Sequence, residues 1–293
     1  MKVSTIKFNN TTVTAIHIDK FVFPIDKIND KFGTDWERDF IELLKSKQFD
    51  KLNNWYKDNK KTLIKDRKGI AINANQVEYG PLYRNPHKIW GIGLNYRDHA
   101  TDLSETAPSS IPASFMKADT TIIGHNDEIL LPKQSNKVTG EAELGVIIKT
   151  KCKDVSPDNW MDVVAGFTTI IDMTTEDILR QNPRYLTLSK NFDTFFSFGP
   201  LLLTADDIKD VLNLRVATVL NGSIHAQNII SNMQFTPDFL VSFHSKVMTL
   251  LPGDIISTGT PRAVKLTHGD TIECRITGFP SLINNVRDLK FNK

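Results

Sequence analysis

The sequence predicts a β-rich fold, a sandwich or roll of short strands, behind a small N-terminal domain. Short apolar segments that end in Gly, Pro or Asp recur through the second two thirds of the 293 residues. Only two clear helical patterns interrupt them, at 175–181 and 237–250, which argues against alternating βαβ units. Two prolines and a glycine make 79–88 the best linker. We therefore expect an N-terminal domain over 1–80 and a catalytic domain over 85–293.

The N-terminal region combines strand and helix patterns. Residues 1–20 alternate polar and apolar side chains around the turn FNNTT, which predicts two short strands. Residues 35–56 have apolar side chains at helical spacing, with Asp35 near the start. This pattern predicts one amphipathic helix or a helical pair.

Beyond the linker, each strand prediction depends on an apolar run bounded by turn residues. Asn221-Gly222 is a hairpin signal, and Thr236 followed by Pro237 is a typical helix start. The expected strands are KIWGIGL (88–94), ELGVIIKT (143–150), VVAGFTTIID (163–172), FGPLLLT (198–204), LRVATVLNGSIH (214–225), DIISTGTP (254–261) and TIECRITG (271–278).

Composition argues against several classes of protein. A net charge of +2 identifies no partner, and the densest basic stretch, 51–69, is best explained as a solvated helix and loop rather than a nucleic-acid patch. Cys152 and Cys274 are too few for a disulfide framework or a zinc site. No apolar run approaches the roughly 20 residues that span a bilayer, and the N-terminus has no signal-peptide core. We expect a cytoplasmic protein without nucleic-acid or membrane partners.

Two glutamates stand close together at the start of an apolar strand. Glu141 and Glu143 are two residues apart, so a strand projects both from one face. Asp172 ends another apolar strand, and three carboxylates converging at strand ends suit Mg²⁺, Mn²⁺ or Ca²⁺. The alternative is that the glutamates lie on an exposed edge and that Asp172 caps the helix beginning at Thr174.

The stretch GIGLNYRDHA (91–100) carries a second candidate group. It has two of the three glycines of a dinucleotide-binding loop, so it is a weak match to that motif. His99 follows a tight turn and precedes Asp102 and Glu105, and a histidine oriented by a carboxylate can activate water. A structural or merely exposed histidine is the alternative.

Two further residues could contact a substrate. Lys190 lies among aromatic residues and could supply positive charge to a carboxylate or enolate, or it could be a surface lysine. Thr258 and Thr260 follow the strand in GDIISTGTP, where hydroxyl and backbone N–H groups could bind an anion or simply form a turn.

Six collinear motifs resemble the fumarylacetoacetate hydrolase family. They span about residues 85–290 in a single order, which makes the match specific: GLNYRDHA, FMKADTTIIGHNDEI, GEAELGVIIK, VAGFTTIIDMTTED, SKNFDTFFSFGP and MTLLPGDIISTGTP. The resemblance implies an α+β, β-rich fold, a mixed β-sandwich roll with a small N-terminal α/β domain, commonly dimeric.

The resemblance also implies roles for individual residues. A divalent metal, Mg²⁺ or alternatively Mn²⁺ or Ca²⁺, is held in the family by the residues that match Glu141, Glu143 and Asp172. The residues expected at the substrate are Lys117, Lys190 and Thr260. The segment from His99 to about Ala113 resembles a lid that orders on ligand binding.

Two residues depart from the family pattern. Relatives usually carry Glu where this chain has Asp102, so its shorter side chain, or Glu105, would have to orient His99. Relatives usually carry Arg where this chain has Glu176, which removes a positive charge near the site. NPRYLTLSK is similar to the sugar-acid dehydratase branch.

The expected activity is metal-dependent hydrolysis of a C–C bond in a small 2,4-dioxo acid. The alternatives are a lyase on the same scaffold, either an oxaloacetate decarboxylase or a 2-oxo-3-deoxy sugar acid dehydratase, and a non-catalytic relative that binds metal or ligand. The partners expected are a small 2-oxo acid and a second copy of the chain.

Overall fold

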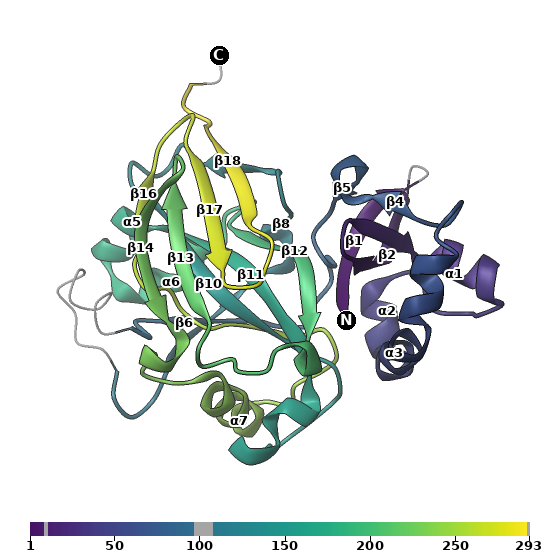
Figure 1. Ribbon diagram of the computed structural model, residues 1–293. Coiled ribbons are helices and arrows are strands. Elements are labelled where there is room, and N and C mark those ends of the chain that lie inside the picture. Colours follow the sequence, from purple (N-terminus) through teal and green to yellow (C-terminus); the bar gives the residue numbers. More distant parts are fainter. Residues whose placement is uncertain (9–10, 97–107, 292–293) are drawn as a thin grey trace.

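Two packed sheets form the centre of the molecule in a computed structural model that describes residues 1–8, 11–96 and 108–291 (Figure 1). Within these residues the larger sheet has 13 strands, in the order β4-β3-β2-β1-β12-β11-β10-β15-β6-β7, with β5 beside β1, β8 beside β12 and β16 beside β10. The smaller sheet has 5 strands, in the order β14-β13-β17-β18-β9. The architecture is α+β and β-rich, as the sequence predicts.

The strands of the larger sheet are β1 (Lys2–Phe8), β2 (Thr11–Ile18), β3 (Phe21–Pro24), β4 (Ile72–Asn73), β5 (Glu78–Tyr79), β6 (Ile89–Gly93), β7 (Ala113–Lys117), β8 (Ile122–Ile123), β10 (Val138–Ile148), β11 (Val164–Thr175), β12 (Phe196–Thr204), β15 (Ile255–Ser257) and β16 (Val264–Leu266). Those of the smaller sheet are β9 (Glu128–Leu131), β13 (Arg215–Leu220), β14 (Ser223–Ile229), β17 (Thr271–Ile276) and β18 (Leu282–Asp288). The α-helices are α1 (Ile25–Phe32), α2 (Phe40–Lys45), α3 (Phe49–Lys65), α5 (Glu176–Gln181), α6 (Leu186–Lys190) and α7 (Pro237–Val247). All of the strands and helices expected beyond the linker form, with shifted ends.

Strand β10 is buried along its whole length, so its two faces serve different cores. Ala142, Leu144 and Val146 face the smaller sheet and pack with Ile272 and other apolar side chains of that sheet. Ile147 belongs instead to the core beneath the N-terminal elements. Because side chains alternate along a strand, Glu141 and Glu143 share the face of Ile147.

The N-terminal strands continue the larger sheet. Strand β1 pairs antiparallel with β12, with Val3 opposite Leu202. Helices α1, α2 and α3 cover this end of the sheet (Figure 1) and share a core with it, in which Phe198 of β12 contacts Tyr83 edge-on. The division at residues 80–85 stays a prediction.

Residues 35–56 form the helical pair rather than a single helix, because α2 and α3 are separate. Asp35, expected near the start of this pair, lies five residues before α2. Asp39 caps α2 instead, and its Oδ1 accepts a hydrogen bond from the Ile41 amide at 2.9 Å. Helix α1 was not expected from the sequence, and only two of its eight residues, Ile25 and Ile28, are buried.

The Asn221-Gly222 hairpin forms as predicted between β13 and β14. Both residues have positive φ, 50° and 81°, the conformation that a two-residue hairpin turn of this hand requires and that glycine adopts without strain. Both cysteines are free. Among the described helices, none combines the length and apolar character that a membrane crossing needs.

Candidate functional site

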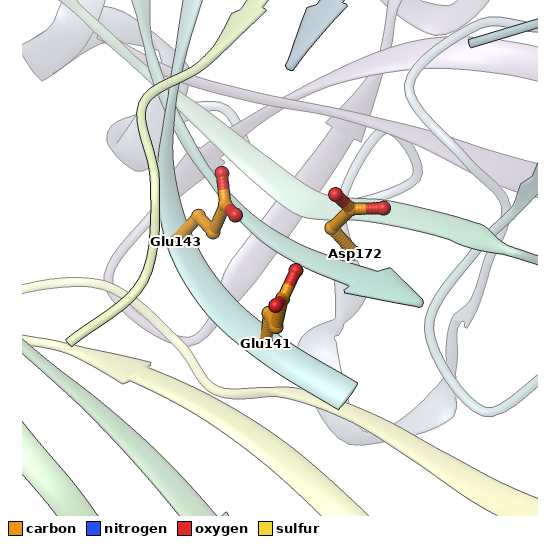
Figure 2. A group of neighbouring side chains, drawn as sticks. All are labelled: Glu141, Glu143 and Asp172. Atoms are coloured by element: carbon orange, nitrogen blue, oxygen red, sulfur yellow. The ribbon is translucent and has the colours of Figure 1, made fainter. Parts of the chain in front are cut away.

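Three carboxylates converge between β10 and β11. Glu141 lies directly opposite Asp172 in the antiparallel register, and Glu143 follows two residues along the same face of β10. One oxygen from each carboxylate lies within 4.8 Å of the others. Figure 2 shows the three side chains pointing into one shared space.

Burial decides between the two explanations of these residues. Glu141 is 8% exposed, Glu143 2% and Asp172 0%. The exposed-edge alternative is therefore wrong. Asp172 also caps no helix, because α5 begins only at Glu176 and its N-cap residue is Thr175.

Two buried lysines face the carboxylates. Lys190, at the end of α6, donates to Glu141 Oε2 at 2.8 Å and to Asp172 Oδ2 at 2.7 Å. Lys117, at the end of β7, donates to Asp172 Oδ1 at 2.6 Å and to the backbone carbonyls of Met173 and Lys190. The surface-lysine alternative for Lys190 is wrong, because the residue is only 5% exposed.

Burial and neighbouring charges shift the pKa values of Glu143 and Asp172 in opposite directions. Burial, reinforced by the charges of Asp172 and Glu141, raises the pKa of Glu143 to about 8. Burial also acts to raise the pKa of Asp172, but Lys117 and Lys190 outweigh it and hold that pKa below its usual range. The lysines therefore compensate the charge of Asp172 by more than burial disfavours it, whereas the charge of Glu143 is not compensated in this way.

Burial and neighbouring charges also shift the pKa values of Lys117 and Lys190 in opposite directions. Burial lowers the pKa of Lys117 to about 8 despite Asp172 beside it. Burial acts in the same direction on Lys190, but the charges of Asp172 and Glu141 outweigh it and raise the pKa of Lys190 above its ordinary value. Lys190 thus stays an ammonium ion throughout the neutral range.

A cavity of about 450 Å³ opens over this group. Glu141, Glu143, Lys190 and Thr260 are among the residues that line it. Thr260 follows β15, is 2% exposed and donates its hydroxyl to the Arg262 carbonyl at 3.3 Å. Lys117 is not among the described residues that line the cavity, so its predicted contact with substrate stays a prediction.

The lid residues cannot be placed beside this cavity. His99, Asp102 and Glu105 lie outside the described residues. Their predicted pairing stays a prediction from the sequence.

Sequence reasoning missed the groups that hold Glu143 in place. Ser257 donates its hydroxyl to Glu143 Oε2 at 2.5 Å, and the Gly259 amide donates to the same oxygen at 2.8 Å. In the stretch GDIISTGTP, the sequence indicates Thr258 and Thr260 as possible anion-binding residues and gives no role to Ser257. Ser257 ends β15, which pairs with β10. That pairing depends on the register between the two strands, so the sequence carries no local signal for the contact.

The donor set fits a divalent metal. Carboxylate oxygens are the ligands that Mg²⁺, Mn²⁺ and Ca²⁺ prefer. With every group ionised, three carboxylates outnumber two ammonium groups, and the raised pKa of Glu143 reflects its burial together with repulsion from Asp172 and Glu141. A divalent cation between the carboxylates would relieve it.

Comparison with known proteins identifies the relatives of this chain. The family model described as "Fumarylacetoacetate (FAA) hydrolase C-terminal" matches residues 88–287. An uncharacterised protein of Methanocaldococcus jannaschii is 38% identical over 243 residues, which are 82% of this chain and 98% of that protein.

Two further relatives have named activities. The mitochondrial oxaloacetate tautomerase Fahd2a of Rattus norvegicus is 35% identical over 223 residues, 73% of this chain and 71% of that protein. The solved structure of 5-carboxymethyl-2-hydroxymuconate delta-isomerase from Mycobacterium smegmatis has a TM-score of 0.76 and 26% identity, and the match covers 98% of this chain and 99% of that chain.

Proposed function

The chain belongs to the fumarylacetoacetate hydrolase family, and from this premise we propose that it is a divalent-metal-dependent enzyme acting on a small 2-oxo acid through its enolate. The observation that carries the proposal is the buried group of Glu141, Glu143 and Asp172 at the end of a cavity that can hold such an acid. These three residues would hold the metal. Mg²⁺ is our first choice, and Mn²⁺ and Ca²⁺ accept the same oxygen ligands.

A bound divalent ion supplies Lewis-acid polarisation of the substrate's 2-oxo group. The protein must then hold its own charges in fixed positions, since preorganised charge stabilises an enolate without reorganisation. Lys190 fits this role because it lines the cavity and its Nζ lies 4.6 Å from the centre of the Phe115 ring. Lys117, buried behind the carboxylates, fixes the orientation of Asp172.

Hydrolysis of a 2,4-dioxo acid is the reaction we place first. Water adds to the 4-oxo carbon, the C3–C4 bond breaks, and its electron pair passes to the enolate of a 2-oxo acid, which takes up a proton at C3. A carboxylic acid is the second product. His99, oriented by Asp102 or Glu105, would take the proton from the attacking water. Thr260 would contact the distal part of the substrate.

Keto–enol isomerisation is the second candidate, and the 35% identity to an oxaloacetate tautomerase favours it. This reaction moves one proton between C3 and the 2-oxo oxygen and breaks no C–C bond, so it needs no activated water. A decarboxylase, a dehydratase and a non-catalytic binding protein remain further alternatives with the same metal site.

One substrate panel separates these reactions. Metal-loaded protein is incubated with an acylpyruvate, with oxaloacetate and with a 2-oxo-3-deoxy sugar acid, and the enol absorbance and the released acids are followed in parallel. Release of pyruvate and a carboxylic acid from the acylpyruvate supports hydrolysis. A change in enol absorbance without cleavage supports tautomerisation. Binding of oxalate without turnover of any substrate would leave only the binding protein.

A further inference from the structure

Beyond the carboxylate end, the cavity has a second part that decides which substrates fit. We propose that the part of the substrate beyond C4 is apolar and uncharged, and that Glu176 enforces this by neutralising Arg180. The proposal rests on the proposed function, because it assumes that the 2-oxo acid end lies at Glu141, Glu143 and Asp172.

The course of β11 fixes where the distal part lies. Thr174 is two residues beyond Asp172, about 7 Å along the strand, and Glu176 begins the helix that follows. Both residues line the cavity. A substrate bound beside Glu141, which lies opposite Asp172, would therefore extend past Thr174 toward α5.

Most of the wall along this path is apolar. Aliphatic and aromatic side chains come from β6, β7, α5 and the segment that leads into α6: Ile92, Leu94, Phe115, Leu179, Pro183 and Leu186. Such a wall stabilises hydrocarbon that leaves water, and it offers a carboxylate no hydrogen bond in place of the hydration it loses.

Arg180 is the one guanidinium among the described residues that line the cavity, and it already has a carboxylate partner. Its Nε and Nη2 both lie 2.6 Å from Glu176 Oε1. Lys137 donates to the same oxygen at 2.8 Å. The Arg180 side chain is 59% exposed, whereas that of Glu176 is 11% exposed.

A second carboxylate on the substrate would therefore bind weakly. It would have to displace Glu176 from Arg180, or lie close to the negative charge of Glu176. An alkyl or aryl group meets neither obstacle. Glu176 and Arg180 together are thus specificity-determining residues that reject a distal carboxylate.

Two 2-oxo acids of similar shape test this directly. In 5-methyl-2-oxohexanoate an isopropyl group stands where 2-oxoglutarate has its distal carboxylate, and neither acid can undergo the proposed 2,4-dioxo cleavage. Their dissociation constants are measured by calorimetry with the Mg²⁺-loaded protein. We expect the apolar acid to bind at least about tenfold more tightly, from burial of two methyl groups.

Variants then identify the residues responsible. Glu176→Gln removes the carboxylate partner of both Arg180 and Lys137, of which Arg180 lines the cavity. It should narrow the ratio of the two dissociation constants about three- to tenfold by tightening 2-oxoglutarate binding. Glu176→Gln combined with Arg180→Gln removes the freed charge that lines the cavity and should restore the ratio of the unmodified protein. Glu128→Gln is the matched control, since Glu128 pairs with Arg287 on the smaller sheet.

Each outcome has a distinct meaning. Equal binding of the two acids, or tighter binding of 2-oxoglutarate, overturns the inference and leaves the proposed function standing. An unchanged ratio in Glu176→Gln removes the role given to the Glu176–Arg180 pair. If neither acid binds in the presence of Mg²⁺, the proposed function fails, and the inference fails with it.

Discussion

Lys190 and Asp172 form a buried ion pair, with 2.7 Å between Nζ and Oδ2. The same ammonium group reaches Glu141, so one lysine bridges two of the three carboxylates proposed as metal ligands. Since buried charges are stable only when compensated, this lysine has a structural role as well as the proposed catalytic one.

Lys190→Met should therefore destabilise the metal-free protein. We expect a loss of about 3 kcal/mol in the free energy of unfolding, the lower end for a broken buried pair because Lys117 still contacts Asp172. Mn²⁺ should restore part of this loss, since a cation between the carboxylates replaces the missing charge. Urea unfolding with and without Mn²⁺ measures both effects. Lys7→Met, which removes an exposed pair with Glu78, is the control; equal losses in the two variants would contradict the argument.

Glu143→Gln tests the metal site itself. The variant keeps the size of the side chain but removes one proposed ligand charge, so Mn²⁺ binding measured by calorimetry should weaken at least about tenfold. The metal-free fold should not lose stability, because burial already disfavours the ionised form of this carboxyl group. Unaltered Mn²⁺ affinity would show that the ligand assignment is wrong.

Removal of the metal should abolish activity. With excess EDTA, turnover of the acylpyruvate should fall to background, because no lysine of the site replaces the Lewis acid. Mg²⁺ or Mn²⁺ added in excess of the chelator should restore it. Full turnover by a preparation shown to be metal-free by elemental analysis would refute the mechanism.

The lid pair separates the two candidate reactions. If the enzyme is a hydrolase, His99→Ala should lower kcat about 10²–10⁴-fold while KM changes less, because the metal site still binds the substrate. Asp102→Glu should raise hydrolysis, and Asp102→Asn should lower it. If the enzyme is a tautomerase or a lyase, His99→Ala can be mild. Unchanged hydrolysis in His99→Ala, with metal affinity intact, would exclude the water-activation step.

A buried histidine makes stability depend on pH. Burial lowers the pKa of His17 to about 4, and its Nε2 hydrogen-bonds with Ser4 Oγ at 2.7 Å. The unfolded chain binds a proton near pH 6.5, so stability is greatest above that pH and falls as the pH drops toward 4. The loss should reach about 3 kcal/mol. His17→Asn should flatten this part of the stability curve in urea unfolding at pH 7 and pH 4.5. If the free energy of unfolding of His17→Asn falls as steeply between pH 7 and pH 4.5 as that of the unmodified protein, His17 is not the cause of the loss.

Local sequence patterns were enough to predict the strands that carry the three buried carboxylates. Glu141 and Glu143 are two residues apart, and the period of a strand places them on one face whatever the rest of the chain does. The Asn-Gly turn and Pro237 at the start of α7 are equally local. Asp172 was expected beside them from its place at the end of an apolar strand, and six motifs in one order added the family.

Tertiary structure decided everything that depends on strand register and on burial. The register between β10 and β11 sets Asp172 opposite Glu141, and pairing with β15 brings Ser257 to Glu143. The sequence could not distinguish a buried Lys190 from an exposed one, since a lysine is buried only where distant residues supply compensating charge. The attachment of β1 to β12, about 200 residues later, likewise has no local signal. Periodicity is encoded by neighbours along the chain, whereas register and burial arise from contacts between residues far apart in sequence.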